Sequence, residues 1–327
     1  MMRRFTVVAF LSFVALPALP AVTALANCGS ESSCPLEPSS GHADARFLFD
    51  VNQLYIDQDQ PRVGTEDAAV GAIPSHHDEV RTKNWILNFR GVYRPAPGWA
   101  LAANIPYVDR MHEHIHHQNG EDELEHWDDN GLGDMELSAS RSIASSSGRR
   151  LRFGLGLKTP TGKQTPSYTE EGDPIEPSAR IGTGSWDLLA NLASEWHVHA
   201  PGKSAEATMP LMLTVAGRYN GTGVESYRHG AEGLIHLSTE YPVVGHVAAL
   251  FQANYRVRAK DDVGTSDQED EDNTGGVALY VTPGLRFEAA PGLSIYGMAQ
   301  FPVYERVNGI QIVAETNIVA GISRSIF

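Results

Sequence analysis

WILNFRGVYR, residues 85–94, places its largest apolar side chains at every second position. Trp85 and Phe89 share one face of an extended chain, whereas Asn88 and Arg90 share the other, because successive side chains of a strand point to opposite faces. A strand that crosses a bilayer between lipid and a polar lumen needs only about 9 to 11 residues with this alternation. The segment is therefore typical of a transmembrane β-barrel.

Two further segments follow the same alternation. Residues 246–259 direct Phe251 to the apolar face, and residues 184–198 direct Trp186 and Trp196 to it. The two tryptophans are ten residues apart in the sequence. This corresponds to roughly 25 Å of height at about 3.3 Å per residue and a tilt near 40°. Such a height is expected between the two aromatic girdles of a membrane barrel.

Twelve segments of this kind follow one another along the chain. We expect strands at residues 46–57, 80–94, 98–107, 132–144, 150–159, 184–198, 207–220, 230–242, 246–259, 275–289, 293–304 and 312–327. A soluble two-sheet sandwich also alternates, but the aromatic residues near strand ends and the regular change between long and short connectors favour the barrel. The sequence therefore predicts an all-β, membrane-spanning antiparallel β-barrel of about twelve strands. Its long loops are expected to be extracellular, and its short turns and both termini periplasmic.

The last predicted strand has one irregular feature. Ile318, Ile322 and Ile326 share a face, whereas Phe327 is opposite to them in phase. We therefore expect a β-bulge near residues 323–326. A terminal aromatic residue is a common ending of outer-membrane barrels, so the barrel-assembly machinery is an expected partner.

The start of the chain has the pattern of an export signal. Two arginines precede an apolar stretch that ends in the small-x-small sequence of residues 24–26. Two prolines and the short length of this stretch argue against a membrane-spanning helix. We expect residues 1–26 to be removed as a signal peptide and residues 27–45 to form a periplasmic segment. Residues 46–327 are expected to form the barrel, in the outer membrane of a Gram-negative bacterium.

The periplasmic segment contains the two cysteines of the chain, Cys28 and Cys34. Thiols oxidise in that compartment, which favours a disulfide between them. A pair of ligands for a soft metal is the alternative.

The charge of the chain limits its partners. The formal net charge is −15, so nucleic acid is excluded as a partner. Acidic residues are concentrated at residues 108–131 and 261–273, which are two predicted external loops. We expect these loops to lie near lipopolysaccharide and to attract divalent cations. Ser226 and His229 lie close together in the sequence, but the chain has no Gly-x-Ser-x-Gly motif. We therefore expect neither an enzyme nor a bound cofactor, only outer-membrane lipid, lipopolysaccharide and small solutes as further partners.

The predicted loop at residues 108–131 is rich in histidine. Its candidate ligands for zinc, nickel or copper are His112, His114, His116, His117 and His126. Three of the first four share a face if the segment is extended, and His112 and His116 share one if it is helical. The alternative is a hydrated acidic loop whose histidines bind no metal.

The inward faces of the predicted strands carry charges of both signs. The candidate pore-lining residues are Arg90, Arg94, Asp134, Glu136, Arg152, Asp187, Glu195, Arg218, Arg256, Arg258 and Arg286. Barrels of eight strands are filled by side chains and barrels of sixteen hold an open channel, so twelve strands predict a narrow bore. A lumen that is closed by internal salt bridges is the alternative.

Several short motifs resemble those of one known family. They are GLGD at residues 131–134, KTPTG at 158–162, GTGSWD at 182–187 and FPVY at 301–304 with NG at 308–309. In this order they resemble the outer-membrane transporter-like barrels that are associated with the phenol meta-cleavage pathway. The chain departs from the family pattern at Ser325, where an aromatic residue is usual.

The resemblance implies an outer-membrane channel with an undefined substrate. The competing interpretation is a surface protein that binds a transition metal through the histidine-rich loop and uses the barrel as an anchor.

Overall fold

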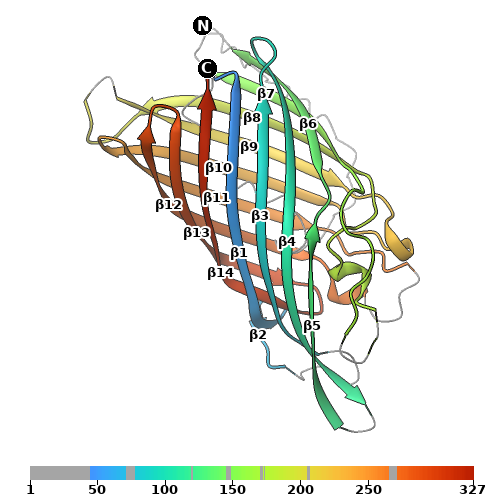
Figure 1. Ribbon diagram of the computed structural model, residues 1–327. Helices are drawn as coiled ribbons and strands as arrows, with labels where there is room; N and C mark the ends of the chain where they lie inside the picture. Colours follow the sequence, from blue (N-terminus) through green and yellow to red (C-terminus); the bar gives the residue numbers. More distant parts are fainter. Residues whose placement is uncertain are drawn as a thin grey trace, which may run out of the picture.

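The first and last long strands pair with each other and close the sheet into a barrel (Figure 1). In this computed structural model β1 (Phe47–Val63) pairs antiparallel with both β3 (Asp78–Tyr93) and β14 (Ile310–Ile326). The structure describes residues 45–327 with gaps at 71–77, 119–120, 145–148, 170–171, 173, 205–206 and 265–270. The predicted signal peptide and the predicted Cys28–Cys34 disulfide lie outside the described residues.

The closed ring has twelve strands. The sheet holds 14 strands, of which β2 (Glu66–Asp67) and β5 (Glu121–Leu132) stand outside the ring. The other ring strands are β4 (Trp99–Gln118), β6 (Glu136–Ala144), β7 (Arg150–Lys158), β8 (Asp187–His199), β9 (Thr208–Tyr219), β10 (Glu232–Val244), β11 (Val247–Arg258), β12 (Gly276–Ala290) and β13 (Leu293–Val307). The predicted all-β, twelve-stranded antiparallel barrel is confirmed.

The outer face of the barrel is apolar where the strands alternate as predicted. Trp85 of β3 is 49% exposed, Leu192 of β8 is 54% exposed and Phe251 of β11 is 46% exposed, whereas the inward-facing Ile86 is 2% exposed. A continuous belt of exposed apolar side chains is stable only against lipid. The barrel therefore spans an outer membrane. In the part of the chain that the structure describes, no helix is long and apolar enough to cross a membrane.

Tight turns connect the strands at the end of the barrel where β1 begins and β14 ends (Figure 1). Three Ala-Pro-Gly turns lie at this end, and their glycines Gly98, Gly202 and Gly292 have φ angles of 75°, 73° and 74°. Only glycine adopts such angles without strain. Long connectors lie at the opposite end, which is the extracellular end. Their described residues include three short 3₁₀ helices, Pro177–Ala179, Val224–Ser226 and Glu271–Asn273.

Residues 108–118 and 121–131 pair as the two strands of a β-hairpin, so their prediction as a loop is wrong. β4 and β5 pair in continuous register from Tyr107 opposite Leu132 to Gln118 opposite Glu121. The hairpin extends beyond the rest of the barrel at the extracellular end (Figure 1). The charged sequence of this segment lacks the apolar alternation that predicts a strand. Outside the membrane neither face of a hairpin needs to be apolar.

The predicted bulge near residues 323–326 is also wrong. The register of β14 against β1 and β13 is regular there, and the irregularities lie between Ile56 and Gln60 of β1 instead. Phe327 is 73% exposed and follows the last residue of β14. Its side chain therefore does not have to follow the alternation of that strand, and no bulge is needed.

Candidate lumen site

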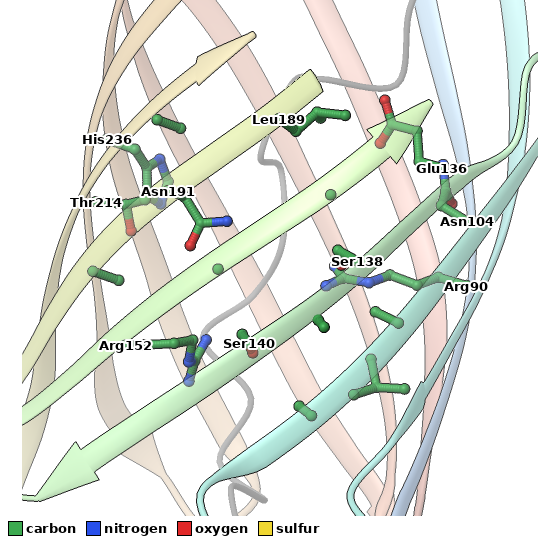
Figure 2. Close-up of a pocket in the computed structure, with 18 of the residues that line it drawn as sticks. Arg90, Asn104, Glu136, Ser138, Ser140, Arg152, Leu189, Asn191, Thr214 and His236 are labelled. Carbon is green, nitrogen blue, oxygen red and sulfur yellow. The ribbon is translucent and has the colours of Figure 1, made fainter. Parts of the chain in front are cut away.

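A cavity of about 480 Å³ lies inside the barrel. Arg90 of β3 and Arg152 of β7 point into it, and Ser138 and Ser140 of β6 lie between them (Figure 2). The two arginines occupy inward positions because each strand alternates strictly between lipid and lumen. The cavity is therefore a product of the predicted strand phase.

Ion pairs also connect strands along the inner wall of the cavity. Arg218 of β9 donates a hydrogen bond to Glu136 of β6. Arg256 of β11 donates to Glu232 of β10 over 3.0 Å. Both arginine side chains are buried, and each pair joins two different strands. The pairs therefore stabilise the wall and also place charged groups on its inner face.

A buried lysine anchors the long loop between β7 and β8. Lys158 Nζ lies 2.8 Å from an oxygen of Asp187 and 3.1 Å from an oxygen of Asp134. Its side chain is 2% exposed. Asp134 also accepts hydrogen bonds from the backbone N–H groups of Gly162 and Thr183, at the two ends of the loop. One lysine and two carboxylates thus fix both ends of residues 159–186.

The part of this loop at Ala179 and Ile181 enters the lumen. Ile181 is 3% exposed and packs in a cluster with inward-facing residues of β1, β3, β4, β11, β13 and β14. Arg110 of β4 donates to the backbone carbonyl of Ala179 and, over 2.7 Å, to the side chain of Asn84. The β7–β8 loop therefore narrows the lumen between the cavity and the extracellular end.

A second buried cluster joins two other extracellular loops. Arg258 Nη2 lies 2.7 and 2.6 Å from the two carboxylate oxygens of Asp261, and the Tyr227 hydroxyl donates to the same carboxylate over 2.5 Å. Burial alone raises the pKa of Asp261, but Arg258, His229 and Tyr227 outweigh it and hold that pKa well below its usual value. The cluster is stable as long as Asp261 is ionised.

The predicted pore-lining residues fall into three groups. Arg90, Arg94, Glu136, Arg152, Arg218 and Arg256 line the cavity. Asp134 and Asp187 anchor the β7–β8 loop instead. Glu195 pairs with Arg150 at 3.5 Å, Arg258 with Asp261, and Arg286 with Glu240, all away from the cavity or at its edge.

Sequence reasoning missed the residues of the loop that narrows the lumen. Ile175 and Ile181 are almost fully buried although they belong to a predicted hydrophilic loop. The only sequence signal of a packed loop is the presence of two isoleucines among prolines, glycines and charged residues. Arg110 was missed because its strand was expected to end at residue 107.

The candidate metal ligands are distributed over the β4–β5 hairpin. His112 Nδ1 lies 2.8 Å from the Thr82 hydroxyl, and His114 Nε2 lies 3.2 Å from a carboxylate oxygen of Glu125. His126 is partly exposed and lies 3.1 Å from Asp128. The side chains of His116 and His117 lie outside the described residues.

Within the described ranges, no group of three or more histidine, cysteine, aspartate or glutamate side chains is placed to hold a metal ion. His112 and His114 share the inner face of the hairpin, as the extended alternative predicts, and His112 stacks on Trp127 with ring centroids 4.9 Å apart. Metal binding by these histidines stays a prediction.

Comparison with solved structures places the chain among outer-membrane barrels. The COG4313 outer membrane channel from Pseudomonas putida F1 matches 88% of this chain and 99% of its own length, with 12% identity and a TM-score of 0.61. The transport unit of the autotransporter AIDA-I from Escherichia coli matches 90% of this chain and 94% of its own, with 9% identity and a TM-score of 0.48. The NanC porin matches 85% and 100%, with 10% identity and a TM-score of 0.44.

Only the first of these scores exceeds 0.5, and at 12% identity it shows a shared fold. No family model matches the chain, and no curated protein matches it by sequence. The fold is thus that of an outer-membrane barrel. The association with phenol degradation stays a prediction.

Proposed function

We propose that this barrel is a passive channel for small solutes across the outer membrane. The observation that carries the proposal is the charged cavity of about 480 Å³ inside a closed, membrane-spanning ring. A structural barrel needs no polar space in its lumen, because side chains fill the interior of the smallest barrels. Charged and hydrogen-bonding walls around a space of this size suit a hydrated solute.

The β7–β8 loop sets the bore. Ile181 packs against the inner wall, and the ion pairs of Lys158 hold both ends of the loop in place. A loop that is fixed at both ends in this way is expected to narrow the lumen permanently and not to move in and out of it. The channel is therefore expected to pass small molecules slowly and to exclude polymers.

Single-channel recording in planar lipid bilayers tests the proposal. The exported, folded protein should give discrete and reproducible conductance steps, and the same protein unfolded by heat should give none. Silent bilayers from protein that migrates as a folded barrel would contradict the channel. Silence together with stoichiometric zinc, nickel or copper retained by His112 and His114 would favour the metal-binding surface protein.

A further inference from the structure

The cavity wall carries an excess of positive charge. Six arginines and two glutamates line it, and Glu195 pairs with one of these arginines, Arg150, which leaves three positive charges in excess. The lining arginines are Arg90, Arg94, Arg150, Arg152, Arg218 and Arg256, and the glutamates are Glu136 and Glu232. A low-dielectric wall focuses such a charge and concentrates anions in the space it encloses.

The positive charge of the wall is only partly compensated. The two glutamates pair with Arg218 and Arg256. Glu136 also lies close enough to attract Arg90, whereas Arg94 and Arg152 lie close enough to repel it. A guanidinium group presents up to five N–H donors in a planar fork that suits a carboxylate. An anion placed between Arg90 and Arg152 would relieve this repulsion, and Ser138 and Ser140 lie beside it as further donors (Figure 2).

The end of the cavity nearest Ile181 has an apolar wall formed by β1, β3 and β14. Leu54, Ile86 and Val319 line the cavity and belong to the same buried cluster as Ile181 of the β7–β8 loop. A solute held at the arginines therefore extends toward hydrocarbon side chains. A purely polar anion would leave this end without a partner.

We infer that the cavity is a binding site for small organic carboxylates with an apolar body, such as an aryl carboxylate. The inference rests on the proposed function and names the class of solute. The carboxylate lies between Arg90 and Arg152, and the apolar body lies against Leu54, Ile86 and Val319. The volume of about 480 Å³ is within the range of small-ligand sites, which is roughly 300 to 1,000 Å³.

Calorimetric titration of the folded barrel in detergent tests the inference without any need for conduction. Benzoate should bind with a measurable affinity. Benzyl alcohol has the same ring without the charge, acetate has the charge without the ring, and benzylamine carries the opposite charge. Each of these three should bind at least about tenfold more weakly than benzoate. Equal binding of benzoate and benzyl alcohol, or no binding of benzoate, would overturn the inference.

A pair of variants locates the site. R90Q/R152Q should lower benzoate affinity by about tenfold or more, because it removes two charge-assisted contacts. The matched control is R141Q, because Arg141 lies over the Trp99 ring and does not line the cavity. Its affinity should equal that of the wild type. If both variants bind benzoate like the wild type, the carboxylate does not lie at these arginines.

Failure of the carboxylate site can be distinguished from failure of the channel. Conductance without benzoate binding keeps the channel and rejects the carboxylate site. Benzoate binding by a barrel that gives silent bilayers keeps the site and rejects the channel. Binding together with a benzoate-dependent block of the current, relieved in R90Q/R152Q, supports both.

Discussion

At the scale of single residues, the alternation of β8 fixes which substitutions the barrel tolerates. Leu192 is 54% exposed to lipid near the middle of the strand, and its neighbour Asn191 lines the cavity. Leu192→Arg should destabilise the barrel by about 2 to 4 kcal/mol, because it places a charge near the centre of the bilayer. Asn191→Arg should cost clearly less. Urea refolding titrations in lipid vesicles measure both, and equal losses would contradict the register of β8.

The buried lysine of the loop anchor should be far more sensitive than an exposed one. Lys158→Met leaves Asp134 and Asp187 buried without their cation, which costs about 3 to 5 kcal/mol. Lys260→Met is the control, because Lys260 pairs with the exposed Asp272 and such pairs contribute about 0 to 1 kcal/mol. The same refolding titration compares the two variants. Equal effects would show that the Lys158 cluster does not anchor the loop.

The low pKa of Asp261 predicts a pH dependence of the extracellular loops. A carboxylate whose pKa falls on folding contributes stability that is fully present above its unfolded pKa, near 3.8, and is lost as the pH falls toward the folded value. Hydrogen exchange of the Gly230 amide reports on this, because that amide donates to Asp261 over 2.8 Å. Its protection should be constant between pH 7 and about pH 5 and should fall below about pH 4. The Asp261→Asn variant should exchange faster at pH 7, and equal protection in the two proteins would contradict the assignment.

The residues of the lumen were only partly predictable from the sequence. Arg90 and Arg256 line the cavity, and their inward direction follows from the alternation of side chains along a strand once one face is apolar. Which arginine meets which carboxylate depends on the stagger between strands, and the sequence does not state it. Asp134 and Asp187 were therefore expected in the pore, whereas they meet at Lys158.

At the scale of elements, the β7–β8 loop controls the lumen. Ile181→Ala removes the apolar side chain that packs against the inner wall, which costs roughly 2 to 5 kcal/mol for a buried residue and widens the narrowing. Single-channel conductance should rise. Leu188→Ala on the lipid face of β8 is the control and should leave conductance unchanged. An unchanged conductance of Ile181→Ala would show that the solute path does not pass this loop.

Elements inside the membrane are more predictable from the sequence than elements outside it. Strands inside the bilayer were predicted to within a few residues, because lipid imposes an apolar face on each of them. The β4–β5 hairpin was predicted as a loop, because water on its surface imposes no such pattern. The inserted β7–β8 loop was not predicted either, because its few buried isoleucines give no period.

At the scale of the whole molecule, closure of the ring explains why the lumen exists. Each strand contributes a lipid face and a lumen face, and a twelve-stranded ring leaves a space that one inserted loop narrows without filling the cavity. The size of the ring could be counted from the sequence. The cavity could not, because its volume depends on how the β7–β8 loop packs and on which charges pair across the wall.

Chemical modification of the lumen during single-channel recording tests the channel most directly. Ser138→Cys places a thiol in the cavity wall, and Leu155→Cys places one on the lipid face of β7. Both are made in a background where Cys28 and Cys34 are replaced by serine. A small anionic methanethiosulfonate reagent should lower the conductance of Ser138→Cys in one step and leave that of Leu155→Cys unchanged. Complete modification of Ser138→Cys, verified by mass spectrometry, without any change of current would contradict conduction through this lumen.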